Sequence, residues 1–283
     1  MISAAEVAAA FRAACREEIE APKPGNVHVF ADGHNMEAAH FLTSAEASAG
    51  PIAAPGASVG ARVLGAVAAS FDAVGMNTNL GIVLLCAPLA AAAERGGALR
   101  PALAHVLADL DRNDADQVFR AIALANPGGL GAAARHDVHA PAETTLLEAM
   151  REAAPRDRIA YQYASDFDDI FATGLFALAE ADRCGLGAPL RAVAVYLAFL
   201  GRFVDTHIFR KCGAGAAAAV QREASEMLLL FQSRRGDCLP ELLAFDASLK
   251  ARGLNPGTSA DLTVATLFAD RLRNGLPSRR NDD

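Results

Sequence analysis

The order of hydrophobic and polar positions along the chain is typical of helices. No stretch shows the sustained polar and apolar alternation, with β-branched enrichment, that marks a strand. Ala, Leu, Glu and Arg, which favour helix, fill much of the sequence. Ser3 followed by Glu6 is a capping-box pattern, and it predicts a helix that runs to about Ile19. Further helices are predicted over residues 36–49, 57–73, 80–95, 101–109, 114–125, 142–153, 166–183, 188–201, 205–211, 215–233, 238–251 and 258–273.

Several of these segments are apolar on nearly every side, as over Ile82–Ala93 and Val193–Leu200. A helix of that kind lies in the middle of a bundle, with other helices around it. The chain contains no internal repeat and no low-complexity linker, and its last residues, Arg279–Asp283, are charged. The prediction is one all-α domain over residues 1–283, a multi-helix bundle with central apolar helices and a flexible tail from about residue 276.

Composition and charge narrow the range of functions. The sequence is 52% hydrophobic and 21% charged, which excludes a disordered chain. Its 26 basic and 33 acidic residues give a net charge of −7, the reverse of the balance in a general nucleic-acid binder. An anionic ligand would therefore be held by a local pocket, not by the field of the whole molecule.

Cysteine usage and hydropathy predict a soluble, cytoplasmic protein. The five cysteines are dispersed without a CxxC pair, and the N-terminus has no basic segment followed by an apolar run. The most membrane-like stretch, Ala73–Ala93, is interrupted by polar residues and by Pro88, which argues against a spanning helix. No nucleic-acid or membrane partner is predicted, and the abundant apolar helices leave room for a homodimer face.

The end of the first helix and the loop after it break local rules. Three glutamates, at 17, 18 and 20, sit where the helix dipole disfavours negative charge. Directly after them, Pro24 holds Lys23 extended and Gly25 permits a sharp turn. This pattern is typical of a rigid loop that presents one ammonium group to a phosphate. The alternative is a helix-ending turn in which Lys23 pairs with one of the glutamates.

A second polar segment, Gly75–Gly81, leads directly into an apolar helix. Asn79 or Thr78 can cap that helix, and the free N–H groups of its first turn form a ready anion site. An ordinary N-cap needs one such residue. This segment has three such residues, Asn77, Thr78 and Asn79. The two that capping does not require favour ligand contacts.

Two segments in the second half of the chain repeat this arrangement. Asn255–Asp261 is a turn followed by hydroxyls at a helix start and an acid in the first turn, and capping leaves Ser259 unexplained. In Asp205–Gly213, Arg210 and Lys211 lie in a last helical turn before glycine. Cations are favoured there by the helix dipole alone, and the functional alternative is that they clamp a polyphosphate.

Four motifs, taken in order along the chain, resemble one family. They are PKPG at 22–25, GMNTNLG at 75–81, DTHIFRK at 205–211 and NPGTSADL at 255–262; RDRIAYQYASDF at 156–167 and NPGGLG at 126–131 are also similar to family segments. On these motifs the chain resembles, as a divergent member, the triphosphoribosyl-dephospho-CoA synthase family, which serves citrate lyase and malonate decarboxylase. The resemblance spans nearly the whole chain, and four ordered motifs are more specific than any one alone.

The resemblance implies an all-helical enzyme that uses ATP as a substrate together with Mg²⁺. In the implied reaction the ribose 2′-hydroxyl of dephospho-CoA attacks the anomeric carbon of the ATP ribose, and adenine leaves while the triphosphate is kept. Such a site needs cations and helix N-termini for the triphosphate and a carboxylate to take the hydroxyl proton.

The motif residues are of the types that this reaction requires. The candidate catalytic acids are Glu17, Asp205 and Asp261, and Asp205 and Asp261 are also the candidate Mg²⁺ ligands. The candidate nucleotide- and phosphate-binding residues are Lys23, Gly25, Asn77, Thr78, Asn79, Arg210, Lys211, Asn255 and Ser259. The sequence does not assign the individual acids to their roles.

The chain departs from the family pattern in two motifs, and alternatives stay open. Where citrate lyase systems read closer to PKPGLVD and NTHKG, this chain has Asn26 and His28 in the first motif and Asn79 and Leu80 in the second. One alternative acceptor is a pterin- or furan-type one-carbon cofactor intermediate. Two further alternatives are a kinase-like phosphoryl transfer and a non-catalytic nucleotide-binding module, and the charged residues kept in the motifs argue against the latter.

Overall fold

The computed structural model describes residues 2–128 and 137–274, and in them the regular secondary structure is helical apart from two isolated β-bridges. The predicted all-α fold is confirmed. The elements are α1 (Ala4–Ile19), α2 (Ala38–Ile52), α3 (Val59–Val74), α4 (Leu80–Arg95), α5 (Leu99–Ala108), α6 (Arg112–Ala125), α7 (Leu146–Ala153), α8 (Arg158–Ala164), the π-helical segment η1 (Asp169–Gly174), α9 (Leu175–Arg183), α10 (Ala188–Arg202), α11 (Thr206–Ser233), α12 (Leu239–Ala251) and α13 (Gly257–Asn274).

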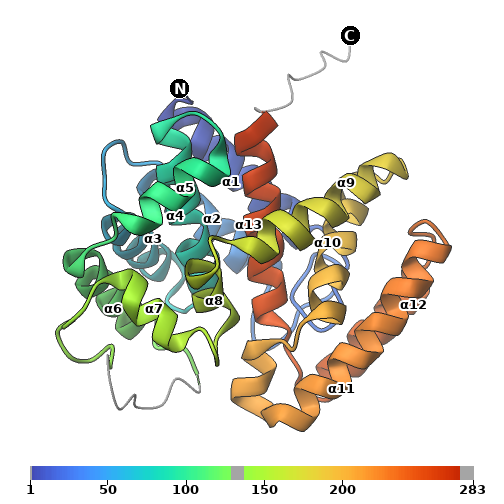
Figure 1. Ribbon diagram of the computed structural model, residues 1–283. Helices are drawn as coiled ribbons and strands as arrows, with labels where there is room; N and C mark the ends of the chain where they lie inside the picture. The colour runs from blue at the N-terminus through green and yellow to red at the C-terminus, as the bar shows by residue number, and fades with distance from the viewer. Residues whose placement is uncertain (1, 129–136, 275–283) are drawn as a thin grey trace.

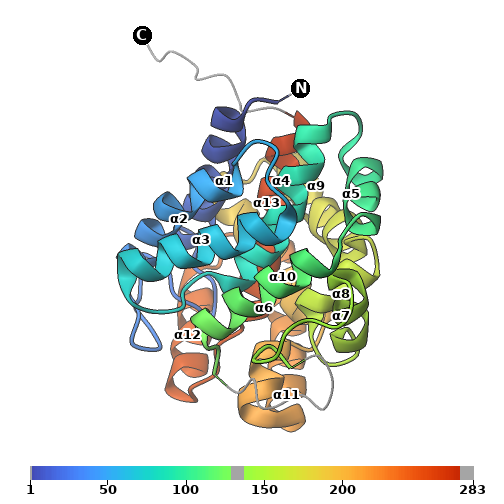
Figure 2. The same ribbon diagram turned by 90° about the vertical axis from the view of Figure 1, so that its left-hand side faces the viewer.

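Helix α13 runs lengthwise through the middle of the molecule, with α1–α4 on one side and α9–α12 on the other (Figure 1). In the view turned by 90°, α2 and α3 lie across the front, with α4 and α13 behind them (Figure 2). Between Ile82 and Ala92 every residue of α4 is buried except Ala91, and α10 is similarly enclosed over 193–200. The prediction of central apolar helices is therefore confirmed for these two segments.

The central position of α13 is less obvious from its sequence, because four hydroxyl-bearing residues lie among its buried positions. Two of them satisfy their hydroxyls within the helix. Thr263 donates to the carbonyl of Ser259 at 2.8 Å, and Thr266 donates to the carbonyl of Leu262 at 2.9 Å. A buried hydroxyl that bonds to the preceding turn leaves no unpaired donor, so this helix can occupy the core.

Most of the predicted helices are present, and α4 has the predicted ends. Two predictions differ in continuity. The segments 205–211 and 215–233 form one helix, α11, which is bent at Gly213, where φ is 86° and ψ is 168°. The predicted helix over 166–183 is divided into η1 and α9. At Gly174 the main chain comes so close to α13 that a Cβ would lie 2.2 Å from the hydroxyl oxygen of Thr266.

Helix α8 was not predicted. It has seven residues, which is too short for a helical period to stand out in the sequence. Its start is fixed by Asp157, whose side chain accepts from the N–H groups of Ile159 and Ala160. An aspartate in this position stabilises the first turn of a helix and compensates for short length.

Within residues 2–128 and 137–274 no single helix has the length and apolar composition to cross a membrane. Two helix pairs reach that length only in combination, and they are bent, by 111° between α4 and α5 and by 45° between α10 and α11. The tail predicted to be flexible from about residue 276 lies outside the described residues, as do residues 129–131 of the glycine-rich motif.

The loop Pro22–His28 is held by helices that lie far along the chain. The N–H of Gly25 donates to Asp246 Oδ1 of α12 at 2.8 Å, and the hydroxyl of Tyr196 in α10 donates to the carbonyl of Pro24 at 2.6 Å. The main chain of the loop is therefore anchored on both neighbouring helices.

Gly25 is required here for packing and for backbone conformation, and we expect its replacement to be costly. Its φ is +81°, and a Cβ would lie 2.8 Å from Leu249 Cδ1 and 2.9 Å from Pro256 Cδ. Gly25→Ala should lower the free energy of unfolding by about 3 kcal/mol. Gly56→Ala is the matched control, because φ there is +67° but nothing lies within 4 Å of its Cβ position. The control should cost about 1 kcal/mol. Urea unfolding measures both, and equal losses would contradict the packing argument.

Candidate functional site

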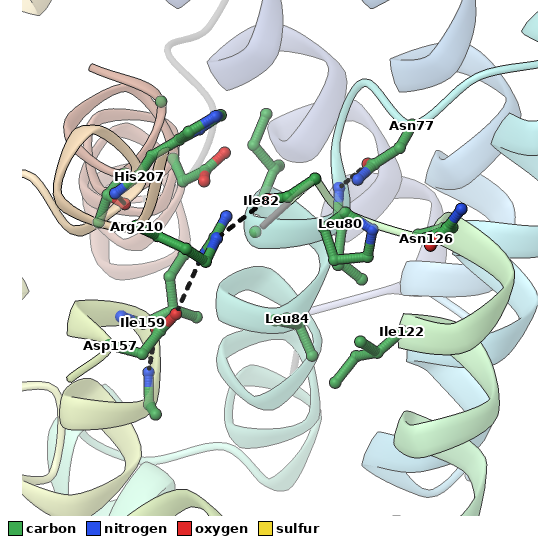
Figure 3. A pocket seen from close by; sticks show the side chains of 18 of the residues that line it. Asn77, Leu80, Ile82, Leu84, Ile122, Asn126, Asp157, Ile159, His207 and Arg210 are labelled. Atoms are coloured by element: carbon green, nitrogen blue, oxygen red, sulfur yellow. Dashed lines mark hydrogen bonds and ion pairs between the residues drawn. The ribbon is translucent and has the colours of Figure 1, made fainter. Parts of the chain in front are cut away.

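A cleft of about 1190 Å³ opens where several helices begin. Its lining includes the first turns of α4, α11 and α13 and the start of α8 (Figure 3). The first N–H groups of a helix have no acceptor within the helix and carry the positive end of its dipole. Which of these groups remain available to a ligand depends on the side chains that cap them.

Asp205 joins the starts of α11 and α13. Its Oδ1 accepts from the N–H groups of His207 and Ile208 at 3.0 and 3.1 Å, and its Oδ2 accepts from the N–H and the hydroxyl of Ser259, both at 2.8 Å. Burial raises the pKa of the Asp205 carboxyl, and these four donors oppose that rise. Both oxygens are used and the residue is 3% exposed, so Asp205 lies behind the wall of the cleft.

Hydroxyl groups extend this network to α8. The Thr206 hydroxyl accepts from the N–H of Arg158 at 3.2 Å and lies 3.1 Å from the Thr258 hydroxyl. The Thr258 hydroxyl also accepts from the N–H of His207 at 3.1 Å. The starts of α8, α11 and α13 are thus held together by one set of hydrogen bonds, which fixes the cleft wall that they form.

The three polar residues before α4 differ in their positions: two line the cleft and one is buried outside its lining. Asn77 caps the helix by accepting from its first N–H at 3.2 Å, and Thr78 bonds to a serine of α2 at 2.6 Å. Both residues line the cleft. Asn79 is buried outside the lining, where its side chain bonds to the hydroxyls of Ser48 and Ser70, each at 2.9 Å.

Asp261 lines the cleft and has no hydrogen-bond or ion-pair partner within the described part of the chain. Its carboxylate lies against the first turn of α4: a Cβ on Gly81 would be 2.0 Å from Asp261 Oδ2. Burial, and then the negative charges of Glu18, Asp205 and Asp157, raise the pKa of Asp261 well above its usual value. Asp261 is half-buried. A carboxylate that lines a cleft with a raised pKa and no partner is the expected form of a group that receives a proton.

Glu18 reaches the cleft from the last turns of α1, with Lys23 directly behind it. The Lys23 ammonium is fully buried and bonds to Glu18 Oε1, to Asn26 Oδ1 at 3.1 Å and to the carbonyl of Val27 at 3.0 Å. An ammonium has three protons, and all three are used. Lys23 is not part of the lining. Of the two alternatives for this lysine, the structure therefore shows the one in which it pairs with a glutamate.

Glu17 faces away from the cleft. Its carboxylate pairs with Arg271 and lies 3.5 Å from the Nε of Arg191. Adjacent residues on a helix point in directions about 100° apart, so two neighbouring glutamates cannot share one wall. Glu18, rather than Glu17, is the acid of α1 that lines the cleft.

Three cationic side chains line the opposite part of the cleft: Arg156, Arg210 and Lys211. Arg210 donates to the carbonyl of Gly128 at 3.2 Å and lies 3.5 Å from Asp157 (Figure 3). Lys211 has no acceptor within the described residues. The cleft therefore contains positive charge that is only partly compensated, in a protein whose net charge is −7.

His207 adds an unpaired imidazole to the same wall. Its ring lies so close to α13 that a Cβ on Gly257 would be 2.3 Å from Nδ1, and its Nε2 is buried without a partner within the described residues. Burial, and then the charges of Lys211 and Arg210, lower the pKa of His207 to about 3. The ring is therefore neutral near pH 7, with one nitrogen able to donate and the other to accept.

The remainder of the cleft is apolar. Many of the side chains in this part come from α4, α6, α7 and α8. Leu84, Ile122 and Ile159 are labelled in Figure 3. An apolar wall beside a charged one suits a ligand with a ring at one end and phosphates at the other. The apolar residues include Leu84, Val118, Phe119, Ile122, Leu146, Met150 and Ile159.

The predicted site residues divide into two groups. Those that line the cleft are Asn77, Thr78, Arg210, Lys211, Asn255 and Asp261. Those that lie outside its lining are Glu17, Lys23, Gly25, Asn79, Asp205 and Ser259. Lys23, Asn79, Asp205 and Ser259 are buried and hydrogen-bonded next to residues that do line it, so these four support the walls.

Several lining residues were missed by the sequence analysis, although three of them lie in segments that it quoted. Glu18 is not among these three, and helical spacing does not single it out, because Glu17 and Glu18 both lie on the buried side of α1. Asp157 lies in the segment 156–167, Gly81 in the motif at 75–81 and His207 in the motif at 205–211. The roles of Gly81 and His207 were still not predicted, because they come from close approaches between separate helices.

In the described ranges, no group of three or more His, Cys, Asp or Glu side chains could hold a metal ion. The two predicted Mg²⁺ ligands differ in availability. The Asp205 oxygens are used by four donors, whereas the Asp261 carboxylate and Oε2 of Glu18 have no hydrogen-bond partner in the same ranges.

Comparisons with known proteins give one family and one fold. The sequence model of the ATP:dephospho-CoA triphosphoribosyl transferase family matches residues 4–280. Among solved structures, the chain is similar to an Archaeoglobus fulgidus protein named as a candidate triphosphoribosyl-dephospho-CoA synthase, with 24% sequence identity and a TM-score of 0.64, covering 83% of this chain and 99% of that chain. None of the curated proteins matches the sequence. The structural likeness establishes a shared fold.

The double cap at Asp205 leads to a prediction on stability. Asp205→Ala removes the acceptors of three N–H groups and one hydroxyl at two helix starts, and we expect it to lower the free energy of unfolding by about 3 kcal/mol. Ser58→Ala is the control, because Ser58 caps only α3, through Ala61 at 3.3 Å. It should cost about 1 kcal/mol. Equal costs in chemical denaturation would show that Asp205 does not join the two helices.

Proposed function

Because the chain belongs to the ATP:dephospho-CoA triphosphoribosyl transferase family, we propose that the cleft described above carries out this family's reaction. The chain is an enzyme of the transferase class, with ATP and dephospho-CoA as its substrates. The observation that carries the assignment of the site is the unpaired carboxylate of Asp261, which shares one cleft with the partly compensated cations of α11.

The reaction exchanges one bond at the anomeric carbon of ATP. The 2′-hydroxyl oxygen of dephospho-CoA forms a bond to that carbon and loses its proton, while the glycosidic bond to N9 of adenine breaks. The electron pair of that bond leaves with adenine, which takes up a proton. The site must therefore bind a triphosphate, accept one proton and stabilise positive charge on the ribose.

We assign the triphosphate to the wall that carries Arg210, Lys211 and Arg156. These cations converge on the cleft from α11 and from the segment before α8. Charge-assisted hydrogen bonds from Arg and Lys to phosphate are roughly twice as strong as neutral ones. The local cluster also explains how a chain with a net charge of −7 can hold a polyanion.

We assign the proton to Asp261 and the stabilisation of the ribose to Glu18. Both carboxylates line the cleft, and the charge of Glu18 is the largest Coulombic influence on Asp261. A raised pKa suits Asp261 to accept the hydroxyl proton. A second negative charge nearby lowers the energy of an oxocarbenium-like transition state, as in glycoside chemistry.

The apolar part of the cleft is assigned to the purine that leaves. Flat rings gain from burial against side chains such as Ile122 and Leu84. Neutral His207 lies on the wall of the cleft and can donate a hydrogen bond to a ring nitrogen. The wall thus has both parts that a departing adenine needs, a surface for the ring and a hydrogen-bond donor.

Mg²⁺ fits the free oxygens of this site. The ion binds through one or two carboxylates together with substrate phosphates and water, so a protein site of three ligands is not required. Asp261 and Glu18 would hold it, and one oxygen of either residue is enough. Asp205 is not assigned, because four donors use its oxygens. When bound, Mg²⁺ supplies neutralisation of the triphosphate charge.

The two departures from the family pattern affect the cleft differently. His28 is buried outside the lining, with Nε2 3.4 Å from Asp246, so its imidazole does not enter the site. Asn26 and Leu80 do line the cleft. They place an amide and an apolar side chain where citrate lyase systems have leucine and lysine. An acceptor other than dephospho-CoA, of the pterin or furan type, stays the second candidate on this ground.

The first experiment separates the reaction classes. The protein is incubated with ATP, Mg²⁺ and dephospho-CoA, and the products are resolved by chromatography with mass detection. We expect free adenine and triphosphoribosylated dephospho-CoA. Asp261→Asn, which keeps the shape but not the basicity, should lower the rate of adenine release by about 10³-fold.

Asp109→Asn is the control, because Asp109 pairs with Arg95 at the surface and lies outside the cleft. Its rate should equal that of the wild type. ADP without adenine would instead indicate phosphoryl transfer, and adenine release that needs a different acceptor would identify that acceptor as the substrate. Full activity in Asp261→Asn would remove Asp261 from its role.

A second prediction tests the triphosphate wall. Lys211→Met removes a cation that has no other partner within the described residues, so the KM for ATP should rise about 20-fold, the value of one hydrogen bond to a charged group. Arg252→Met is the control, since Arg252 pairs with Glu223 outside the cleft. Steady-state kinetics at two salt concentrations measure both. An unchanged KM in Lys211→Met would place the triphosphate elsewhere.

A further inference from the structure

We propose that Lys23 is a positioning residue of the reaction, which acts by holding Glu18 and Asn26 in place at the cleft wall. This inference rests on the proposed function for its catalytic consequence. Lys23 itself is 0% exposed and outside the lining, so it meets no substrate. It therefore has a different role from the cations of α11, although all were candidates for binding phosphate.

The ammonium of Lys23 is shared among three acceptors, and two of them belong to side chains of the cleft. Glu18 Oε1 and Asn26 Oδ1 each accept one hydrogen bond from the ammonium, and the carbonyl of Val27 accepts the third. The bond to Glu18 uses one carboxylate oxygen and leaves Oε2 without a hydrogen-bond partner in the described residues. One buried cation thus sets the direction of a carboxylate that lines the site.

The same cation acts further through Asn26. With its oxygen held by Lys23, the amide of Asn26 is oriented so that Nδ2 donates to Asn255 Oδ1 at 2.9 Å. Asn255 lines the cleft just before α13, the helix that carries Asp261. Lys23 therefore determines the orientation of polar groups on α1, on the loop after it and next to α13.

The main chain around Lys23 has anchors of its own. Gly25 is bonded to Asp246 at 2.8 Å and Pro24 to Tyr196 at 2.6 Å, neither of which involves the ammonium. Removal of the charge should therefore release the side chains of Glu18 and Asn26 and leave the path of the loop unchanged. This separates a positioning role from a role in holding the loop.

The test compares Lys23→Met with Lys250→Met. Lys250 anchors the same region, through the carbonyl of Ala31 at 2.9 Å and Asp246 at 3.0 Å, but it touches no side chain of the cleft. Adenine release gives kcat, and calorimetric titration with ATP gives the Kd. For Lys23→Met we expect kcat to fall about 100-fold, the typical effect of a small misplacement. The Kd for ATP should stay within about threefold of the wild type. Lys250→Met should keep the wild-type kcat.

Two outcomes would overturn the proposal. If Lys23→Met weakens ATP binding more than tenfold at unchanged kcat, Lys23 contacts phosphate directly. If Lys250→Met loses as much kcat as Lys23→Met, the lysines only stabilise the loop. Should Lys23→Met fail to fold, Lys23→Gln replaces it, because glutamine keeps a donor for part of the network. Its kcat should be intermediate at unchanged Kd, and a kcat equal to that of the wild type would also overturn the proposal.

A crystal structure of the variant makes the inference independent of the reaction. If the wild type releases no adenine, the proposed function fails, and Lys23 is judged by geometry alone. Displaced side chains at Glu18 and Asn26, with the Pro22–His28 main chain in place, support the positioning role. Unmoved side chains refute it.

Discussion

The cleft depends on one buried carboxylate that serves two helices. Asp205 accepts four hydrogen bonds, two from the start of α11 and two from Ser259 of α13. Because both helices begin at this point, their first turns face the same space. His207 and Arg210 on α11 therefore line the same cleft as Asp261 on α13. Together with the hydrogen bonds of Thr258 to Thr206 and His207, this shared cap fixes the start of α11 relative to the start of α13.

The polar residues of the site fall into two classes according to how completely their hydrogen-bonding capacity is used. Lys23, Asn79, Asp205 and Ser259 are buried with their groups paired, and they lie behind the walls. Asp261 and Lys211 have capacity left and line the cleft. A buried polar group is stable only when paired, and the first class meets that condition within the protein. Asp261 is half-buried and Lys211 is exposed, so both can take a ligand as their partner. This distinction, and not residue type, separates the reacting surface from its support.

The sequence predicted much of the fold, because helix formation is governed by local signals. The ends of α4 and the capping box of α1 follow from neighbouring residues. Short α8 was missed because a helix of seven residues shows too little of its period. The division of 166–183 into two elements was missed for another reason. The division falls at Gly174, where the main chain packs closely against Thr266, a residue 92 positions away in the chain.

The site was also predictable only in part. The reason is again that contacts between residues far apart in the chain determine which side chains line the cleft. The motifs located the right segments, so Asn77, Arg210 and Asp261 line the cleft. The sequence could not distinguish Glu17 from Glu18, because the partners that separate them, Arg271 and Lys23, are settled only by tertiary packing. Whether a lysine binds a ligand or a neighbouring glutamate depends on which acceptors its three N–H groups meet in the folded protein. The sequence around the lysine does not determine this.

The contact between α4 and α13 also constrains how such a site can change over evolutionary time. Gly81 leaves space that the Asp261 carboxylate occupies, since a Cβ there would be 2.0 Å from Oδ2. A side chain at position 81 would therefore force the carboxylate at position 261 out of the place that it occupies. We expect substitutions at the two positions to be epistatic, because alanine at 81 would require the acid at 261 to turn away, to be lost, or the helices to move apart. Among distant relatives, we expect glycine at 81 and an acid at 261 to occur together. A chain that has the glycine without the acid would indicate that the acid was lost first.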